Sequence, residues 1–248
     1  MIIFGINPVL EALRAGRVTE VRVGERSGGR LPEVLSLARE QGVPVRRVPL
    51  EALERESERG VHQGVVADVE AARSYGIEDL VRGAAGTPLL VVLDGIEDPH
   101  NLGAILRTAD AAGVDGVVRQ TRRSAALAGA AAKASAGAVA HVRIAEVVNI
   151  ARALDELKEA GVWTVGLAAD AAIPYDAIDF TLPSAIVLGG EGSGLRRLVR
   201  ERCDFLAAIP LRGHVSSLNV SVAAGVTLFE AVRQRHAKAS GSRARDVT

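Results

Sequence analysis

Three segments of the chain contain most of the polar residues that could do chemistry on a bound ligand. The first segment, residues 93–103, contains Asp98 and Asn101 and leads into a predicted helix that carries Arg107. Side chains at the start of a helix can bind a polar ligand together with its unpaired N–H groups. Asn101 could equally cap the helix, so the spacing leaves both roles open.

The second segment is a glycine-rich loop, LGGEGSGL, at residues 188–195. Glycines lack a Cβ atom and therefore let a backbone approach a ligand closely. The loop lacks the Gly-Lys-Ser/Thr ending of a phosphate-binding loop, and it comes too late in its α/β unit for a dinucleotide-binding motif. Because Glu191 would repel an anion, we expect a neutral or cationic ligand here.

The third segment, IPLRGHVSSLNVS at residues 209–221, leads into the last predicted helix. Ser217 or Asn219 could cap that helix. A serine hydrolase is disfavoured, because the Gly-x-Ser-x-Gly motif is absent. The five histidines show no metal-ligand spacing, so we expect no metal site. Cys203 is predicted to be a small buried residue rather than a nucleophile.

The elements around these segments alternate between strand and helix patterns. A mostly parallel sheet with helices on both faces is expected, and ligands bind such sheets at the carboxyl ends of the strands. The run at 88–93 is apolar throughout, which is typical of a strand covered on both faces. The other predicted strands are 114–118, 162–167, 185–188 and 205–209, and the predicted helices are 102–112, 150–160, 195–202 and 220–235.

The first 70 residues form a separate α/β pattern. Asn7 and Pro8 are expected to begin a helix, as N-cap and first helical residue. Further helices are predicted at 31–41 and 50–59, and strands at 21–23, 43–45 and 64–69. Weak periodicity after this unit suggests a linker. We therefore expect domains at 1–72 and 87–248, joined by a linker at 73–86.

Composition indicates an ordinary globular protein of 248 residues, with 48% hydrophobic and 24% charged residues. No apolar run is long enough for a transmembrane helix, no secretory signal is visible, and there is one cysteine, which together favour the cytoplasm. The formal net charge is zero, which weakly disfavours a purely electrostatic nucleic-acid binder. Only three of the 30 basic residues are lysines; arginine suits phosphate recognition, although a GC-rich genome gives the same bias.

Together, the three segments resemble the ordered motifs of the SpoU (TrmH) family of RNA ribose 2′-O-methyltransferases. The matching stretches are LDGIEDPHNLGAILRTADAAGV, IVLGGEGSGL and IPLRGHVSSLNVSVAAGVTLFEA. Three further stretches are similar to the subgroup that methylates a guanosine of 23S rRNA: FGINPVLEAL, GVHQGVVADV and KASAGAVAHVRIAEVVNIARAL. The resemblance covers nearly the whole chain.

The resemblance implies a SPOUT-type parallel sheet with a C-terminal trefoil knot, preceded by a small L30e-like α/β domain that contacts RNA. It also implies S-adenosylmethionine as cofactor, 23S rRNA as partner and a homodimer, with no membrane and no metal. Two alternatives remain. One is a tRNA ribose 2′-O-methyltransferase of the same family, and the other is a non-catalytic RNA-binding protein of ribosome assembly.

The family's site residues transfer to matching positions of this chain. The expected cofactor-binding residues are Gly189, Gly190, Glu191, Gly192, Ile209, Leu211, Ser217 and Leu218. The expected catalytic residues are Asn101, Arg107, Glu191, Ser217 and Asn219. Arg119 departs from the family pattern, because it replaces an apolar or proline position after the second strand, and this puts the local RNA contacts in doubt.

Arg107 is an awkward general base. Neutralising a guanidinium at pH 7 costs roughly 7–9 kcal/mol from a pKa of about 12.5–13.8. We expect Arg107 instead to grip a phosphate of the target and stabilise the forming alkoxide. Much of the rate can come from holding the ribose oxygen and the methyl carbon in line at about 3–3.5 Å.

Overall fold

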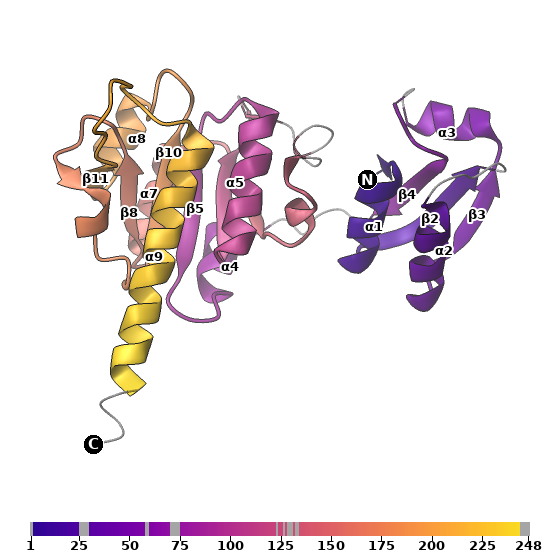
Figure 1. The fold of residues 1–248 in the computed structure, drawn as a ribbon, viewed down its shortest axis with the longest axis horizontal. Helices are drawn as coiled ribbons and strands as arrows, with labels where there is room; N and C mark the ends of the chain where they lie inside the picture. The colour runs from indigo at the N-terminus through magenta and orange to yellow at the C-terminus, as the bar shows by residue number, and fades with distance from the viewer. Residues whose placement is uncertain are drawn as a thin grey trace. The chain divides into compact units, whose positions relative to one another are not determined.

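The computed structural model divides into two compact units, Met1–Arg73 and Ser74–Thr248 (Figure 1). The structure describes residues 2–24, 30–57, 60–69, 75–122, 124–125, 127, 131 and 134–243. Residues 73–74 of the expected linker lie outside this set. Each unit has its own sheet and its own apolar core.

The N-terminal unit is built on a four-stranded sheet in the order β1-β4-β2-β3. β4 runs antiparallel to β1 and β2, whereas β3 runs parallel to β2. Apolar residues of α1 and α2 pack with alternate residues of β2 and β4 in one core. The elements are β1 (Ile2–Phe4), α1 (Ile6–Arg14), β2 (Val18–Gly24), α2 (Leu31–Glu40), β3 (Val45–Val48), α3 (Leu50–Glu56) and β4 (Val65–Val69).

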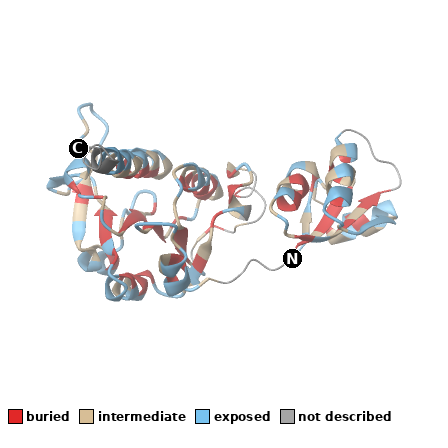
Figure 2. Ribbon diagram, turned by 90° about the horizontal axis from the view of Figure 1, so that it is seen from below, coloured by how far each residue is buried: buried red, intermediate tan, exposed pale blue. Residues whose placement is uncertain are grey.

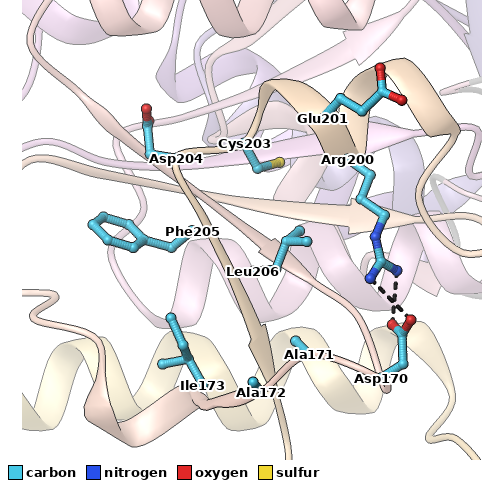
Figure 3. A pocket seen from close by; sticks show the side chains of 10 residues that line it. All are labelled: Asp170, Ala171, Ala172, Ile173, Arg200, Glu201, Cys203, Asp204, Phe205 and Leu206. Atoms are coloured by element: carbon cyan, nitrogen blue, oxygen red, sulfur yellow. Dashed lines mark hydrogen bonds and ion pairs between the residues drawn. The ribbon is translucent and has the colours of Figure 1, made fainter.

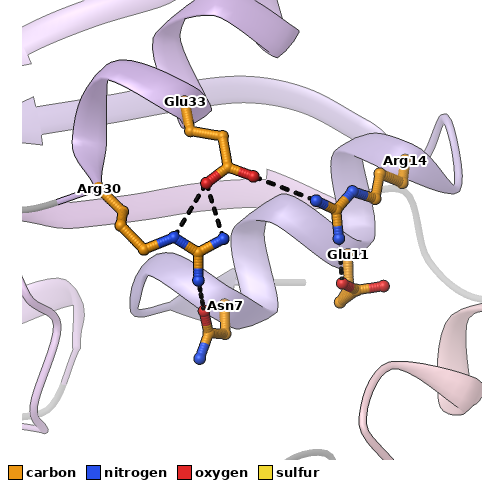
Figure 4. Close-up of polar contacts among 5 residues, drawn as sticks. All are labelled: Asn7, Glu11, Arg14, Arg30 and Glu33. Atoms are coloured by element: carbon orange, nitrogen blue, oxygen red, sulfur yellow. Dashed lines mark hydrogen bonds and ion pairs between the residues drawn. The ribbon is translucent and has the colours of Figure 1, made fainter.

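The expected N-cap role of Asn7 is wrong. α1 begins at Ile6 after Gly5, whose φ of 93° only glycine adopts easily, and the Ile6 N–H donates to Gln63 Oε1 at 3.1 Å. The Asn7 side chain instead accepts a hydrogen bond from Arg30 at 3.2 Å (Figure 4). An ion pair between Glu33 of α2 and Arg14 of α1 links the two helices at the surface, and Arg30 at the start of α2 also pairs with Glu33.

The C-terminal unit is built on a seven-stranded sheet in the order β7-β6-β5-β10-β8-β11-β9. Every neighbouring pair in this sheet runs parallel, which confirms the predicted parallel α/β architecture. The strands are β5 (Leu89–Asp94), β6 (Gly116–Gln120), β7 (Ile144–Val147), β8 (Trp163–Leu167), β9 (Ile173–Pro174), β10 (Ser184–Gly189) and β11 (Phe205–Ala208).

Helices cover both faces of this sheet (Figure 2). Leu89, Val91 and Leu93 face the core shared with α5 and α9, whereas Leu90 and Val92 face the core shared with α4, α7 and α8. This alternation explains why the apolar run at 88–93 is uninterrupted. The helices are α4 (Ile77–Arg82), α5 (Pro99–Ala111), α7 (Ile150–Glu159), α8 (Arg197–Arg202) and α9 (Val220–Arg243), with short 3-10 turns at Ala138–Ala140 and Tyr175–Ala177.

Helix α4 lies where a linker was expected. Ile77 and Leu80 are buried in the core that α7 also contributes to. The Asp79 side chain accepts from the Gly76 N–H at 2.8 Å and caps the helix. Six residues are too few to show helical periodicity, so the sequence pattern missed this helix.

Candidate active site

The three polar segments lie at the carboxyl ends of β5 and β10 and at the start of α9. β5 and β10 are neighbours, and their last residues, Asp94 and Gly189, are paired. The first segment follows β5 and the glycine loop follows β10. The sheet therefore places segments from distant parts of the chain at one edge, as the strand order of a parallel sheet requires.

A chain of hydrogen bonds joins one side chain from each segment. Asn219 Nδ2 donates to Asn101 Oδ1 at 3.0 Å, and Asn101 Nδ2 donates to the Glu191 carboxylate. Asn101 is only 8% exposed. Three of the expected catalytic residues thus lie together, and each amide has its orientation fixed by its neighbour.

Asn101 and Asn219 lie at the starts of α5 and α9 and differ in whether they cap these helices. Asp98 caps α5 by accepting from the His100 N–H at 3.0 Å, so Asn101 is not the cap and its side chain points to Glu191. Asn219 caps α9, because its Oδ1 accepts from the Ser221 N–H at 2.9 Å. Asn219 therefore has both roles that the sequence left open: its oxygen caps the helix while its nitrogen holds Asn101.

The glycine loop is packed against backbone on two sides. A Cβ at Gly189 would lie 2.1 Å from the carbonyl carbon of Gly194, and one at Gly190 would lie 2.4 Å from Gly95 O. Gly192 and Gly194 adopt φ values of 77° and 62°. At these positions glycine is required by the loop's own fold, which is a different reason from the ligand approach expected from the sequence.

Asp94 and Arg196 close the base of the glycine loop, and the sequence analysis did not single out this pair. The Asp94 carboxylate is fully buried and accepts from the Arg196 backbone N–H at 2.8 Å and from Arg196 Nε at 2.6 Å. The Asp94 carbonyl accepts from the Gly190 N–H at 2.9 Å. The sequence does contain a signal for this pair: Asp94 ends a fully apolar strand, and a buried carboxylate there needs a partner.

The remaining expected site residues are not drawn into this network. The side chains of Arg107 and Ser217 are exposed and make no hydrogen bond within the part of the chain that the structure describes. Ile209 and Leu211 are half-buried, and Leu218 is exposed, in the irregular segment between β11 and α9. Arg107 lies on the same helix as Asn101, but no described residue of the C-terminal unit covers it.

Arg119 does not face solvent, so it is not placed to contact RNA. It is 4% exposed, and its guanidinium donates to Ala125 O at 2.8 Å and to Ser124 Oγ at 2.7 Å. Ala125 N in turn donates to Ile96 O at 2.9 Å. Arg119 therefore holds the segment after β6 against the segment after β5.

The electrostatics of the site suit a cationic ligand. Glu191 has no ion-pair partner among the described residues and receives a hydrogen bond from a neutral amide only. The sulfonium of S-adenosylmethionine is a cation, so the negative charge of Glu191 fits that cofactor. No group of three or more potential metal ligands is found among the described residues, and no helix there is long and apolar enough to cross a membrane.

A separate hollow of about 520 Å³ lies beside β11, away from the three segments (Figure 3). Arg200 and Asp170 close one side with two hydrogen bonds of 2.8 and 3.0 Å. Cys203 also lines it and is half-buried rather than fully buried as predicted, and burial of the thiol raises its pKa to about 12. The thiol stays protonated at neutral pH, as expected for a packed cysteine rather than a nucleophile.

Two family models match the chain, one over each unit. The model of the SpoU rRNA Methylase family matches residues 88–229, and the model named RNA 2′-O ribose methyltransferase substrate binding matches residues 2–75. The chain therefore belongs to the SpoU family of RNA methyltransferases.

Two curated relatives are similar to this chain over nearly its whole length. The chain is 48% identical over 239 residues to the 23S rRNA (guanosine-2′-O-)-methyltransferase RlmB of Xylella fastidiosa, covering 94% of this chain and 96% of that one. It is 43% identical over 239 residues to the putative TrmH family tRNA/rRNA methyltransferase YacO of Bacillus subtilis, with the same coverage.

Solved structures share the fold. The SpoU methyltransferase AviRb from Streptomyces viridochromogenes in complex with AdoMet matches with a TM-score of 0.76 at 27% identity, covering 95% of this chain and 90% of that one. An AdoMet-bound rRNA methyltransferase from Sinorhizobium meliloti matches with a TM-score of 0.74 at 27% identity, covering 94% and 86%.

Proposed function

We propose that this protein transfers the methyl group of S-adenosylmethionine to the ribose 2′-hydroxyl of a guanosine in 23S rRNA. The observation that carries the proposal is the Asn219–Asn101–Glu191 chain at the carboxyl edge of the sheet, in a chain whose RlmB-named relatives cover nearly its whole length. The N-terminal unit serves as the substrate reader, and the reaction takes place in the cytoplasm.

The cofactor lies against the glycine loop and the segment before α9. The residues proposed to hold it are Gly189, Gly190, Glu191, Gly192, Ile209, Leu211, Ser217 and Leu218. When bound, it supplies an electrophilic methyl group. The uncompensated Glu191 carboxylate attracts the sulfonium, and Asn101 fixes the direction of that carboxylate. The family's knotted chain path is part of the same proposal.

The chain's own groups act on the ribose by position and charge. Asn101 and Asn219 offer fixed amides next to Glu191, which limits motion of the reacting groups. Arg107 approaches from the exposed side of α5, grips a phosphate of the target and stabilises the developing alkoxide. Water or another group takes the 2′-hydroxyl proton, because the guanidinium is too costly to neutralise.

The active form is a homodimer, and α9 supplies the surface that supports this. Val222, Val226 and Phe229 are 50%, 36% and 51% exposed. Their spacing of four and three residues places them on one stripe of the helix. A second copy of the chain is the proposed cover. α9 packs against α5, whose Arg107 has no side-chain partner among the described residues, and this fits a site that the second copy completes.

The test is methylation of defined RNA by purified protein. Primer extension on a 23S rRNA transcript incubated with the protein and S-adenosylmethionine should give one cofactor-dependent stop next to a guanosine. Asn101→Ala should lower the single-turnover rate by about 10²-fold, whereas Arg152→Ala, which removes an exposed side chain of α7, should leave it unchanged. Methylation of tRNA but not of 23S rRNA would favour the tRNA alternative, and RNA binding without methylation would favour an assembly protein.

A further inference from the structure

A second hollow, of about 330 Å³, lies beside the carboxyl ends of β6 and β7. We call it the β6–β7 hollow. Six of its lining residues matter for the argument: Gln120, Val148, Asn149, Ala151, Arg196 and Arg197. Two of the lining residues are arginines and none is an aspartate or glutamate.

The side-chain acceptors in the β6–β7 hollow are already occupied. Gln120 Oε1 accepts from the Arg196 guanidinium at 2.8 Å, and Asn149 Oδ1 accepts from the Arg152 N–H at 3.2 Å. The Val148 carbonyl accepts from Gln120 Nε2 at 3.0 Å. A ligand in this hollow therefore meets few free acceptors.

The donors, in contrast, remain free. Within the described residues, Asn149 Nδ2 and Arg196 Nη1 have no hydrogen-bond partner. The Arg197 side chain is 83% exposed, and its nearest carboxylate oxygen, on Glu201, is 3.7 Å away, too far for a direct hydrogen bond. The hollow thus presents free N–H donors and, in Arg197, a cation whose carboxylate partner is 3.7 Å away, whereas the charge of Arg196 is balanced by Asp94.

One of its cations is also fixed in place. Arg196 Nε bonds to the buried Asp94 carboxylate, and another guanidinium nitrogen bonds to Gln120. A guanidinium that is already oriented loses little rotamer entropy when it binds an anion. Phosphate oxygens are pure acceptors and form short, strong bonds with arginine.

We propose that the β6–β7 hollow binds a phosphate group of the substrate RNA backbone. The proposal rests on the proposed function and adds an RNA-binding subsite to it. The strand order supports the geometry, because β6 and β7 follow β5 along the same sheet edge that carries Asn101. Adjacent strands lie ~4.7–4.9 Å apart, so one bound RNA strand can reach both places.

Arg197→Ala in the full-length protein tests the proposal, with Arg152→Ala as its matched control. Both side chains are 83% exposed, and both have a glutamate four residues later as their nearest partner. Only Arg197 lines the hollow. Binding of a 23S rRNA transcript is measured over a range of salt concentrations, with S-adenosylmethionine affinity as the check on folding.

The proposal expects Arg197→Ala to weaken RNA binding several-fold and to reduce the slope of log K against log salt by about 0.7–0.9, the value of one phosphate contact. Arg152→Ala should keep the wild-type slope. Equal slopes for Arg197→Ala and wild type would overturn the proposal. So would a loss of inorganic phosphate binding with unchanged RNA binding, since the hollow would then serve a free anion.

The outcome is independent of the proposed function's own test. The salt slope is measured by RNA binding, whereas the function is tested by methylation. If the wild-type protein methylates 23S rRNA and both variants have the wild-type salt slope for RNA binding, the proposed function stands and the phosphate subsite is wrong. If Arg197→Ala shows the expected slope change but the wild-type protein methylates nothing, the phosphate subsite stands and the proposed function fails.

Discussion

At the scale of single residues, the proposed catalytic side chains fall into two sets: some are held by hydrogen bonds within the protein, and others are exposed and free to contact the substrate. Asn101 and Glu191 are bonded to each other, whereas Arg107 is exposed and without a partner among the described residues. A group with no contact in the folded chain can be changed at little cost to stability. Arg107 variants therefore report on the reaction rather than on folding.

We predict that Arg107→Lys will be nearly as inactive as Arg107→Ala in single-turnover methylation. Lysine keeps the charge and has a lower pKa, but it loses the planar fork that grips phosphate. Both variants should bind S-adenosylmethionine with wild-type affinity. If Arg107→Lys retains most of the rate and its pH profile moves downward, Arg107 takes the proton and the fork role is wrong.

Cys203 should react slowly with thiol reagents in the native protein. Burial raises the pKa of this thiol to about 12 from the usual 9.0, so hardly any thiolate exists at pH 8. Ellman's reagent should label Cys203 quickly only after denaturant is added. Because the unfolded thiol ionises first, this group should also lower the free energy of unfolding as pH rises from about 9 towards 12. Rapid labelling of folded protein would contradict the prediction.

At the scale of elements, side-chain hydrogen bonds from the ends of β5 and β6 hold the glycine loop and the segment after β6 in place. The Asp94–Arg196 pair closes the glycine loop between the end of β10 and the start of α8. Arg119 does the same for the segment after β6. These polar contacts lie beneath the site and give its loops one shape before any ligand binds.

Arg196→Ala should weaken S-adenosylmethionine binding although Arg196 is outside the expected cofactor set. The change leaves part of the buried Asp94 carboxylate unsatisfied, which costs about 1–3 kcal/mol. Calorimetry should show lower cofactor affinity, and thermal melts should show a lower Tm. Arg200→Ala, which removes the exposed pair with Asp170, is the control and should change neither by much. Unchanged cofactor affinity in Arg196→Ala would show that the pair does not set the loop's shape.

Much of the element pattern was predictable from the sequence, because long strands and helices show their period in apolar residues. The parallel sheet and the final helix follow from that signal, whereas the buried strand at 88–93 follows from an uninterrupted apolar run that has no period. Short elements such as α4 and β9 do not carry enough residues to show a period. The bond between Asn101 and Asn219 spans 118 residues, and no local pattern predicts such a contact.

At the scale of the whole molecule, the boundary between the units matters for any fragment study. Ile77 and Leu80 belong to the core of the C-terminal unit, so a fragment that begins at residue 87 lacks part of its own core. We predict that residues 75–248 fold, dimerise and bind S-adenosylmethionine but methylate 23S rRNA poorly. Residues 87–248 should melt at a lower temperature. Full methylation by the 75–248 fragment would show that the N-terminal unit is not a substrate reader.

Phe229→Asp should convert the protein to a monomer. A carboxylate at the C-terminal end of the apolar stripe of α9 would be desolvated without a partner in a dimer. Sedimentation should show half the wild-type mass, and circular dichroism should show an intact fold because Phe229 is 51% exposed. Glu230→Gln at the next position of the helix serves as the control. A dimer that survives Phe229→Asp would place the contact elsewhere.

The central position of β10 has a consequence for the chain while it is being made. β5 pairs with β6 on one side, but its other partner, β10, begins only at Ser184. At synthesis rates of ~5–20 residues per second, the 118 residues between Asn101 and Asn219 take roughly 6–24 s to add. Throughout that interval the nascent chain has no assembled site, and until β10 is made β5 exposes an apolar strand edge. Newly made protein therefore depends on protection from aggregation until nearly the whole chain has emerged.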